Sequence, residues 1–191
     1  MSAESGRVLS SKAAWFALLV GLTALVPVPL LDGWLARRAQ RAMFAAIAEG
    51  RGAQLGPAAL DALTEDRDSL LVGCLWMAVV WPIKKLFRTI LYFLTLKDVV
   101  DGAAEAALRA AMLDAALHRA AADARGVRDV MDATLTRWYH SPVNRILLRG
   151  ERPAAAWVAS GGVSGVVGWL FRHAGGGVIV PDFTQRLESP P

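Results

Sequence analysis

The sequence contains one cysteine, Cys74, and few of the patterns that mark catalytic or metal-binding sites. A single thiol excludes an intrachain disulfide and leaves the redox compartment open. The three histidines lie too far apart for a zinc-binding motif. The segment 162–166 lacks the last glycine of a nucleophile elbow, and 175–177 is not followed by the lysine of a phosphate-binding loop. We therefore predict that the protein binds no cofactor and no metal. A non-enzymatic role is favoured over an enzymatic one.

Lysine is also scarce, since it occurs only at positions 12, 84, 85 and 97, so arginine supplies most of the net charge of +4. A basic protein favours anionic partners. No helix-turn-helix, zinc finger or RNA-binding signature accompanies the arginines, so nucleic acid is not predicted as a partner. The basic residues adjoin apolar runs instead, in a chain that is 54% hydrophobic with a mean hydropathy of +0.36. An anionic lipid membrane is the predicted partner.

Three apolar runs, at 13–31, 70–83 and 154–171, are predicted to be helices within a single domain that spans 1–191. The first run has no charge and the minimum length for a membrane span, but Pro27 and Pro29 should end its helix near Val26. The second run is too short to span alone. Membrane-spanning helices, re-entrant helices and buried helices of a soluble core are all compatible with these lengths.

Two helices carry basic residues on one face. The run 84–96 places its cations and Tyr92 opposite six apolar residues, and the helix predicted from Asp32 to Gly50 gathers three arginines within an arc of about 100°. A basic, amphipathic helix beside an apolar run suits a membrane surface, although a solvated face of an ordinary helix has the same pattern. The predicted membrane-interface residues are Arg37, Arg38, Arg41, Lys84, Lys85, Arg88 and Tyr92.

Glycines recur along one face of the third apolar run. Gly161, Gly165 and Gly168 follow a spacing of i, i+4 and i+7, which lets another helix approach closely. The face is predicted to be a helix-packing surface. Its partner could be a second copy of the chain, another membrane protein or a helix of the same chain.

The remaining segments are predicted to be a compact helical cap at 99–149 and an extended tail at 178–191. Within the cap, Asp114 and His118 have the i,i+4 spacing that places a carboxylate beside an imidazole. No nucleophile accompanies them in the sequence. A simple polar pair is therefore the favoured interpretation of these two residues.

The segment Val26–Met43, VPVPLLDGWLARRAQRAM, resembles the proline-containing turn and basic helix of EcsC-like and GTPase-associated membrane helical families of bacteria. Leu30 and Leu31 stand where those families would have a glycine after the second proline. The resemblance implies a helical, membrane-associated accessory role, and it carries over no site residue.

Together these patterns predict an all-α protein with two or three inserted or re-entrant apolar helices, basic interfacial helices and a helical cap. The predicted function is that of a membrane-associated scaffold or interaction protein that binds an anionic lipid surface and packs through its glycine face. It would reside at the inner or cytoplasmic membrane with both termini in the cytoplasm. The alternatives are a soluble helical bundle that binds an apolar ligand or partner helix and, third, an unrecognised membrane enzyme that uses Asp114 and His118.

Overall fold

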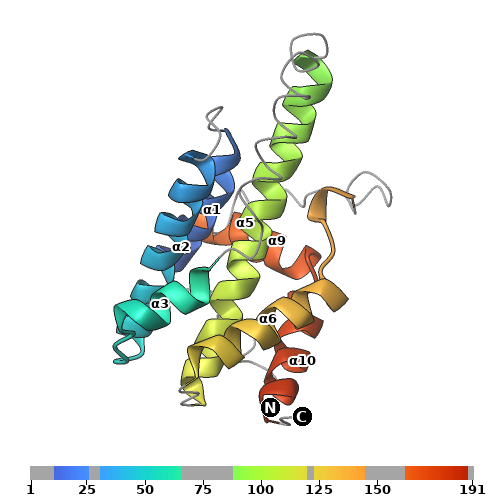
Figure 1. Ribbon diagram of the computed structural model, residues 1–191. Coiled ribbons are helices and arrows are strands. Elements are labelled where there is room, and N and C mark those ends of the chain that lie inside the picture. The colour runs from blue at the N-terminus through green and yellow to red at the C-terminus, as the bar shows by residue number, and fades with distance from the viewer. Residues whose placement is uncertain (1–10, 26–30, 66–87, 120–122, 145–161, 189–191) are drawn as a thin grey trace.

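The computed structural model describes residues 11–25, 31–65, 88–119, 123–144 and 162–188. Within these ranges the regular structure is entirely helical, which confirms the all-α prediction (Figure 1). Seven α-helices and one 3₁₀ turn are defined there: α1 Ser11–Leu22, η1 Thr23–Leu25, α2 Leu31–Gly50, α3 Pro57–Thr64, α5 Arg88–His118, α6 Ala124–Trp138, α9 Gly162–His173 and α10 Gly176–Glu188.

The long helix α5 forms the centre of the molecule and contacts α1, α2, α6, α9 and α10. Figure 1 shows α1 and α2 along one side of α5, α6 across its C-terminal half and α10 below α6, while α9 passes behind α5 and also contacts α1. The middle of α5 is rich in alanine, and Ala104, Ala107 and Ala110 are fully buried. Small side chains there let the surrounding helices approach closely, so that larger residues such as Phe44, Met131 and Phe183 fill the remaining space.

Helices α1 and α5 approach each other closely at Gly21. Helix α1 turns Ala13, Ala14, Ala17 and Gly21 toward the core. A Cβ atom placed on Gly21 would lie 2.8 Å from the Cβ of Ala103 and closer still to the carbonyl oxygen of Val99. The two helices therefore meet backbone to backbone at a glycine that the sequence analysis did not single out.

Helix α2 has nearly the predicted bounds. Its inner face buries Met43, Phe44 and Ile47. The helix ends in a Schellman motif, in which the Ala53 amide donates to the Ala48 carbonyl and the Gly52 amide donates to the Glu49 carbonyl. Gly52 adopts a φ of +69°, a left-handed conformation that glycine tolerates best.

Helix α5 corrects the predicted boundary between an interfacial helix at 84–96 and a cap that begins at residue 99. The helix runs without a break through Lys97 and Asp98. Lys97 forms an ion pair of 2.6 Å with Asp101, one turn further along, so these charges lie inside the helix instead of ending it. Figure 1 shows the N-terminal end of α5 projecting beyond α1 and α2.

The predicted extended tail at 178–191 is wrong for residues 178–188, which belong to α10. Ile179 and Phe183 lie one turn apart and are completely buried, while Pro181 stays exposed between them. Asp182 and Arg186 form an ion pair of 2.7 Å along the same helix. Burial of the two large side chains outweighs the loss of one backbone hydrogen bond at the proline.

The other predicted apolar helices are described only in part. The first run is helical from Ser11 to Leu25, and η1 is its last described turn before the prolines. The run 70–83 lies outside the described residues, and α9 covers only the end of the run 154–171.

Candidate functional site

The outer face of α1 is apolar, although it lies on the surface. Between Ala13 and Leu25 the only polar side chain is Thr23, whose hydroxyl donates to the Val20 carbonyl within the same helix. We use the name α1 ridge for four exposed residues of α1 and of the turn η1 that continues it, with exposed fractions of 53%, 44%, 38% and 51%: Trp15, Leu19, Leu22 and Leu25. Surface helices of globular proteins normally place polar residues there. A contiguous apolar ridge of this kind marks a surface that binds another apolar surface.

The helix α1 has twelve residues, which extend about 18 Å. Among the described residues, no single helix is long and apolar enough to span a membrane. Helices α9 and α10 together have the length and apolar composition of a membrane span, but a bend of 70° separates them.

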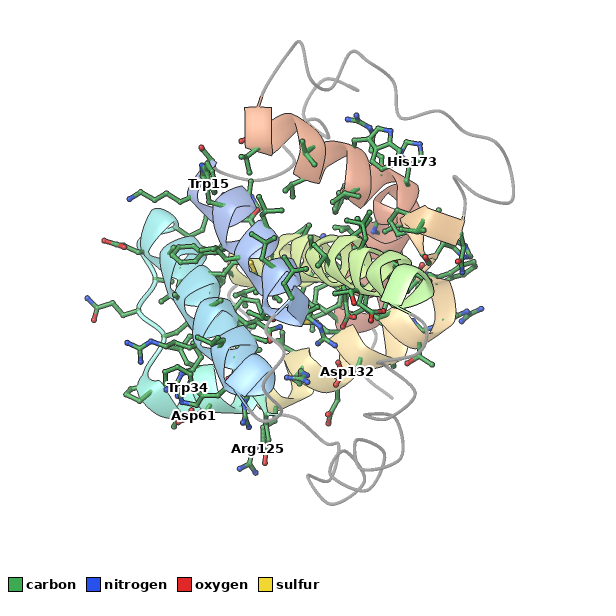
Figure 2. The ribbon with its side chains drawn as sticks, turned by 90° about the horizontal axis from the view of Figure 1, so that it is seen from above. Trp15, Trp34, Asp61, Arg125, Asp132 and His173 are labelled. Atoms are coloured by element: carbon green, nitrogen blue, oxygen red, sulfur yellow. The ribbon has the colours of Figure 1, made fainter. Side chains whose placement is uncertain are left out.

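A second surface feature is a hollow between α2, α3 and the start of α6. We call it the arginine hollow, and its lining is Trp34, Arg37, Arg38, Arg41, Ala58, Asp61, Ala62, Thr64, Glu65 and Arg125. Figure 2 shows Trp34, Asp61 and Arg125 together at one corner of the molecule, well separated from Trp15. The hollow therefore joins side chains from segments far apart in the sequence.

The surrounding helices hold the walls of the hollow in place. Pro57 begins α3, and the end of α3 is attached to α6 because the Arg128 guanidinium donates to the Leu63 carbonyl. The buried side chains of Leu63 and Thr64 then fix the inner face of α3. Asp123 caps α6 by accepting a hydrogen bond of 3.0 Å from the Arg125 amide, which places Arg125 at the rim.

The arginines of the hollow differ in their partners. Arg41 pairs with Asp61 at 2.7 Å, but both side chains are exposed, so the pair contributes at most about 1 kcal/mol. The Arg38 guanidinium lies 5.6 Å from the centre of the Trp34 ring, a cation–π contact that uses none of its N–H donors. The exposed side chain of Arg125 makes no ion pair or hydrogen bond with any residue of the described ranges. Four arginines against Asp61 and Glu65 leave the hollow positively charged.

The structure brings together three of the predicted interface residues, Arg37, Arg38 and Arg41, on the outer side of α2. The hollow also includes Trp34 and Arg125, and no pattern in the sequence predicted that Arg125 belongs to it. Lys84 and Lys85 lie outside the described residues, and for Arg88 and Tyr92 only the backbone at the start of α5 is described. Their role at an interface stays a prediction.

The predicted glycine face is also described in part. Gly161 lies outside the described residues, whereas Gly165 and Gly168 belong to α9. A Cβ atom placed on Gly168 would meet no described atom within 4 Å. Close packing at these three glycines stays a prediction.

Asp114 and His118 lie side by side on α5, as their spacing predicted, but Arg51 joins them. Its Nε donates to one carboxylate oxygen of Asp114 at 2.6 Å, and a terminal nitrogen lies 3.2 Å from Nδ1 of His118. The hydrogen bond and charge of Asp114 raise the pKa of Arg51. A carboxylate held in this way by a guanidinium has few lone pairs left to act as a general base. Among the described residues, no three metal-ligating side chains come together.

One further cluster of charges holds helices together. Asp132 of α6 accepts hydrogen bonds from Arg109 of α5 at 2.8 Å and from Arg128 at 2.9 Å. Burial opposes ionisation of Asp132, but the hydrogen bonds and charges of the two arginines prevail and lower its pKa. Because Arg128 also binds the Leu63 carbonyl, this cluster connects α3, α5 and α6.

Comparison with known proteins finds no matching family model, no matching curated protein and no matching solved structure.

Proposed function

We propose that the protein is a non-enzymatic scaffold or interaction protein that attaches to a membrane surface through the α1 ridge. The observation that carries this proposal is the exposure of Trp15, Leu19, Leu22 and Leu25 along a single helix face. Their side chains would enter the boundary between headgroups and acyl chains while the rest of the bundle stays above it.

The expected strength of attachment follows from the exposed area. Burying a whole leucine stabilises by about 1.5–3 kcal/mol, so a leucine that is about half exposed contributes about 1 kcal/mol on insertion. Tryptophan favours the interface itself, because its ring is apolar and its N–H can still contact water or headgroups. Four such residues favour a reversible peripheral attachment.

Basic residues near the ridge favour an anionic membrane. Lys12 lies in the first turn of α1 and is exposed, and the chain as a whole carries a net charge of +4. Each basic residue close to an anionic surface contributes about 1 kcal/mol. The inner or cytoplasmic membrane is anionic on its cytoplasmic side, and we propose it as the site of attachment.

The main competitor is a protein partner, including a second copy of the chain, on the same ridge. The membrane is favoured because the ridge belongs to a segment, 13–31, that contains no charged residue, and because the chain as a whole is basic and apolar. The resemblance of Val26–Met43 to membrane-associated families agrees with this choice.

The proposal predicts that Leu19→Gln combined with Leu22→Gln weakens binding to anionic vesicles by roughly 25-fold, from about 1 kcal/mol for each leucine. Both side chains are exposed, so the free energy of unfolding should change little. Flotation with liposomes measures the binding, and urea denaturation measures the stability.

The matched control is Val178→Gln on α10, since Val178 is 52% exposed and apolar but lies on another helix. It should leave flotation unchanged. Equal flotation of the double variant and the unmodified protein would contradict the proposal. If the unmodified protein stays out of the lipid fraction and the double variant only converts a dimer into a monomer, the ridge binds a second copy instead.

A further inference from the structure

The arginine hollow has the properties of a binding site in its own right. Its cations come from two helices that are distant in the sequence, Arg38 and its neighbours from α2 and Arg125 from the first turn of α6. A solvated basic face would need only one helix. Here α3 closes the space between α2 and α6, and the basic side chains line a common hollow.

Within the described ranges, two of these guanidinium groups make no ion pair or hydrogen bond through their N–H donors. Arg38 contacts Trp34 through the face of its guanidinium, and its N–H groups make no ion pair or hydrogen bond with a described residue. The same is true of the N–H groups of the Arg125 side chain. Guanidinium groups bind phosphate and carboxylate through paired N–H donors, because the fork of donors matches two oxygens of either group.

The remaining lining residues indicate the kind of anion. Asp61 forms an ion pair with Arg41, and Glu65 adds a second negative charge to the wall of the hollow. A weakly charged anion would gain little there, whereas a phosphate monoester with about −1.5 to −2 charges competes well. Trp34 and the alanines of α3 provide an apolar wall for the carbon skeleton that carries the phosphate.

We propose that the arginine hollow binds a phosphate monoester, with Arg38 and Arg125 as its principal ligands. The phosphate could be the headgroup of a lipid such as phosphatidic acid or a soluble ester of a small polyol. Because Figure 2 places the hollow away from Trp15 of the α1 ridge, this proposal does not depend on membrane attachment through the ridge.

The first test replaces the two ligands. Arg38→Gln and Arg125→Gln should each weaken binding about fivefold, and about 25-fold together, from roughly 1 kcal/mol for each charge. The soluble probe is glycerol 3-phosphate, measured by calorimetry. The membrane probes are phosphatidylcholine vesicles with and without phosphatidic acid, measured by flotation.

The control for charge alone is Arg172→Gln, because Arg172 is an exposed arginine on α9, far from the lining of the hollow. It changes the net charge as much as each ligand substitution does. It should leave calorimetric binding of glycerol 3-phosphate unchanged.

The second test increases binding. Glu65→Gln removes a negative charge from the wall, so it should strengthen binding of glycerol 3-phosphate by roughly two- to fivefold. Glu49→Gln makes the same change of charge at an exposed position outside the hollow and should have no effect. A gain is informative because a misfolded variant would not produce it.

The outcomes separate the sources of the phosphate. A soluble ester is supported if the unmodified protein binds glycerol 3-phosphate and the variant with both Arg38→Gln and Arg125→Gln does not. A lipid headgroup is supported if the unmodified protein prefers vesicles with phosphatidic acid and only this double variant loses the preference. If neither probe binds the unmodified protein, or if Arg172→Gln weakens binding as much as Arg38→Gln, the proposal is wrong. If the variant with Leu19→Gln and Leu22→Gln loses vesicle binding but still binds glycerol 3-phosphate normally, the result supports both proposals.

Discussion

Replacing Gly21 with leucine should lower the free energy of unfolding by about 3 kcal/mol, because α1 and α5 touch at this position. Two of the three atoms nearest to an added Cβ are backbone atoms, the Val99 carbonyl oxygen and the Ala103 amide nitrogen. Backbone atoms inside a helix cannot rotate away as the end of a side chain can. The substitution therefore has to push the two helices apart, which opens gaps around Ala17 and Ala107.

Urea denaturation measures the change, and Gly33→Ala is the matched control. Gly33 also lies in a helix, but a Cβ atom added there meets no described atom within 4 Å. Alanine at Gly33 should leave stability unchanged or raise it by up to about 1 kcal/mol through helix propensity. A Gly21→Leu variant with the same unfolding midpoint as the unmodified protein would show that α1 does not pack on α5 in this way.

Replacing Asp132 with asparagine should lower the free energy of unfolding by about 2–4 kcal/mol at neutral pH. The carboxylate is only 25% exposed, and each of its two arginine partners, Arg109 and Arg128, is only 14% exposed. Without the carboxylate, two poorly solvated guanidinium groups face each other at the junction of α5 and α6. Asp98→Asn, a substitution at an exposed acid of α5, should have almost no effect.

The contribution of Asp132 should also depend on pH. Because the folded protein lowers the pKa of this carboxyl, the unfolded chain binds its proton more readily than the folded one. The stabilisation is fully present above the pKa of the unfolded chain, and it is lost as pH falls through the lower pKa of the folded state. The stability difference between the unmodified protein and Asp132→Asn should therefore shrink in acid. A difference that stays constant from neutral pH to below pH 3 would contradict the role assigned to this carboxylate.

Local signals predicted those elements whose ends depend on local chemistry. The C-terminal end of α2 follows from the glycines after residue 49, since Gly52 takes the left-handed conformation that closes the helix. Ser141 caps the helical turn that begins at Pro142, since its Oγ accepts from the Asn144 amide at 3.2 Å. In each case the decisive contact lies within a few residues along the chain.

The predictions failed where tertiary packing outweighs the local signal. Lys97 and Asp98 resembled the end of a helix, but the pairing of Lys97 with Asp101 keeps these charges inside α5. The tail contains a proline and β-branched residues, yet the core buries Ile179 and Phe183 one turn apart and imposes a helix. Sequence alone does not say which side chains a core will accept.

The candidate sites were predicted only where their residues lie on one helix. The arc of arginines on α2 was evident, because helical periodicity alone places Arg37, Arg38 and Arg41 together. Arg125 could not be assigned to the same hollow, because only the packing of α3 on α6 brings it there. Gly21 was missed for the same reason, since its partner Ala103 lies on a helix much later in the chain.

The contact between Gly21 and Ala103 also sets an order of events during synthesis. Roughly 80 residues separate the two positions, so at about 5–20 residues per second α1 waits roughly 4–16 s before its partner on α5 has been made. Of the described helices that contact α1, only α2 has been made during that interval, so α5 does not yet cover the alanine and glycine side of α1. The nascent chain thus presents apolar surface on both sides of α1 at the time when it is least able to fold. A membrane or a chaperone that captures it at the ribosome would meet a larger apolar surface than the finished protein retains.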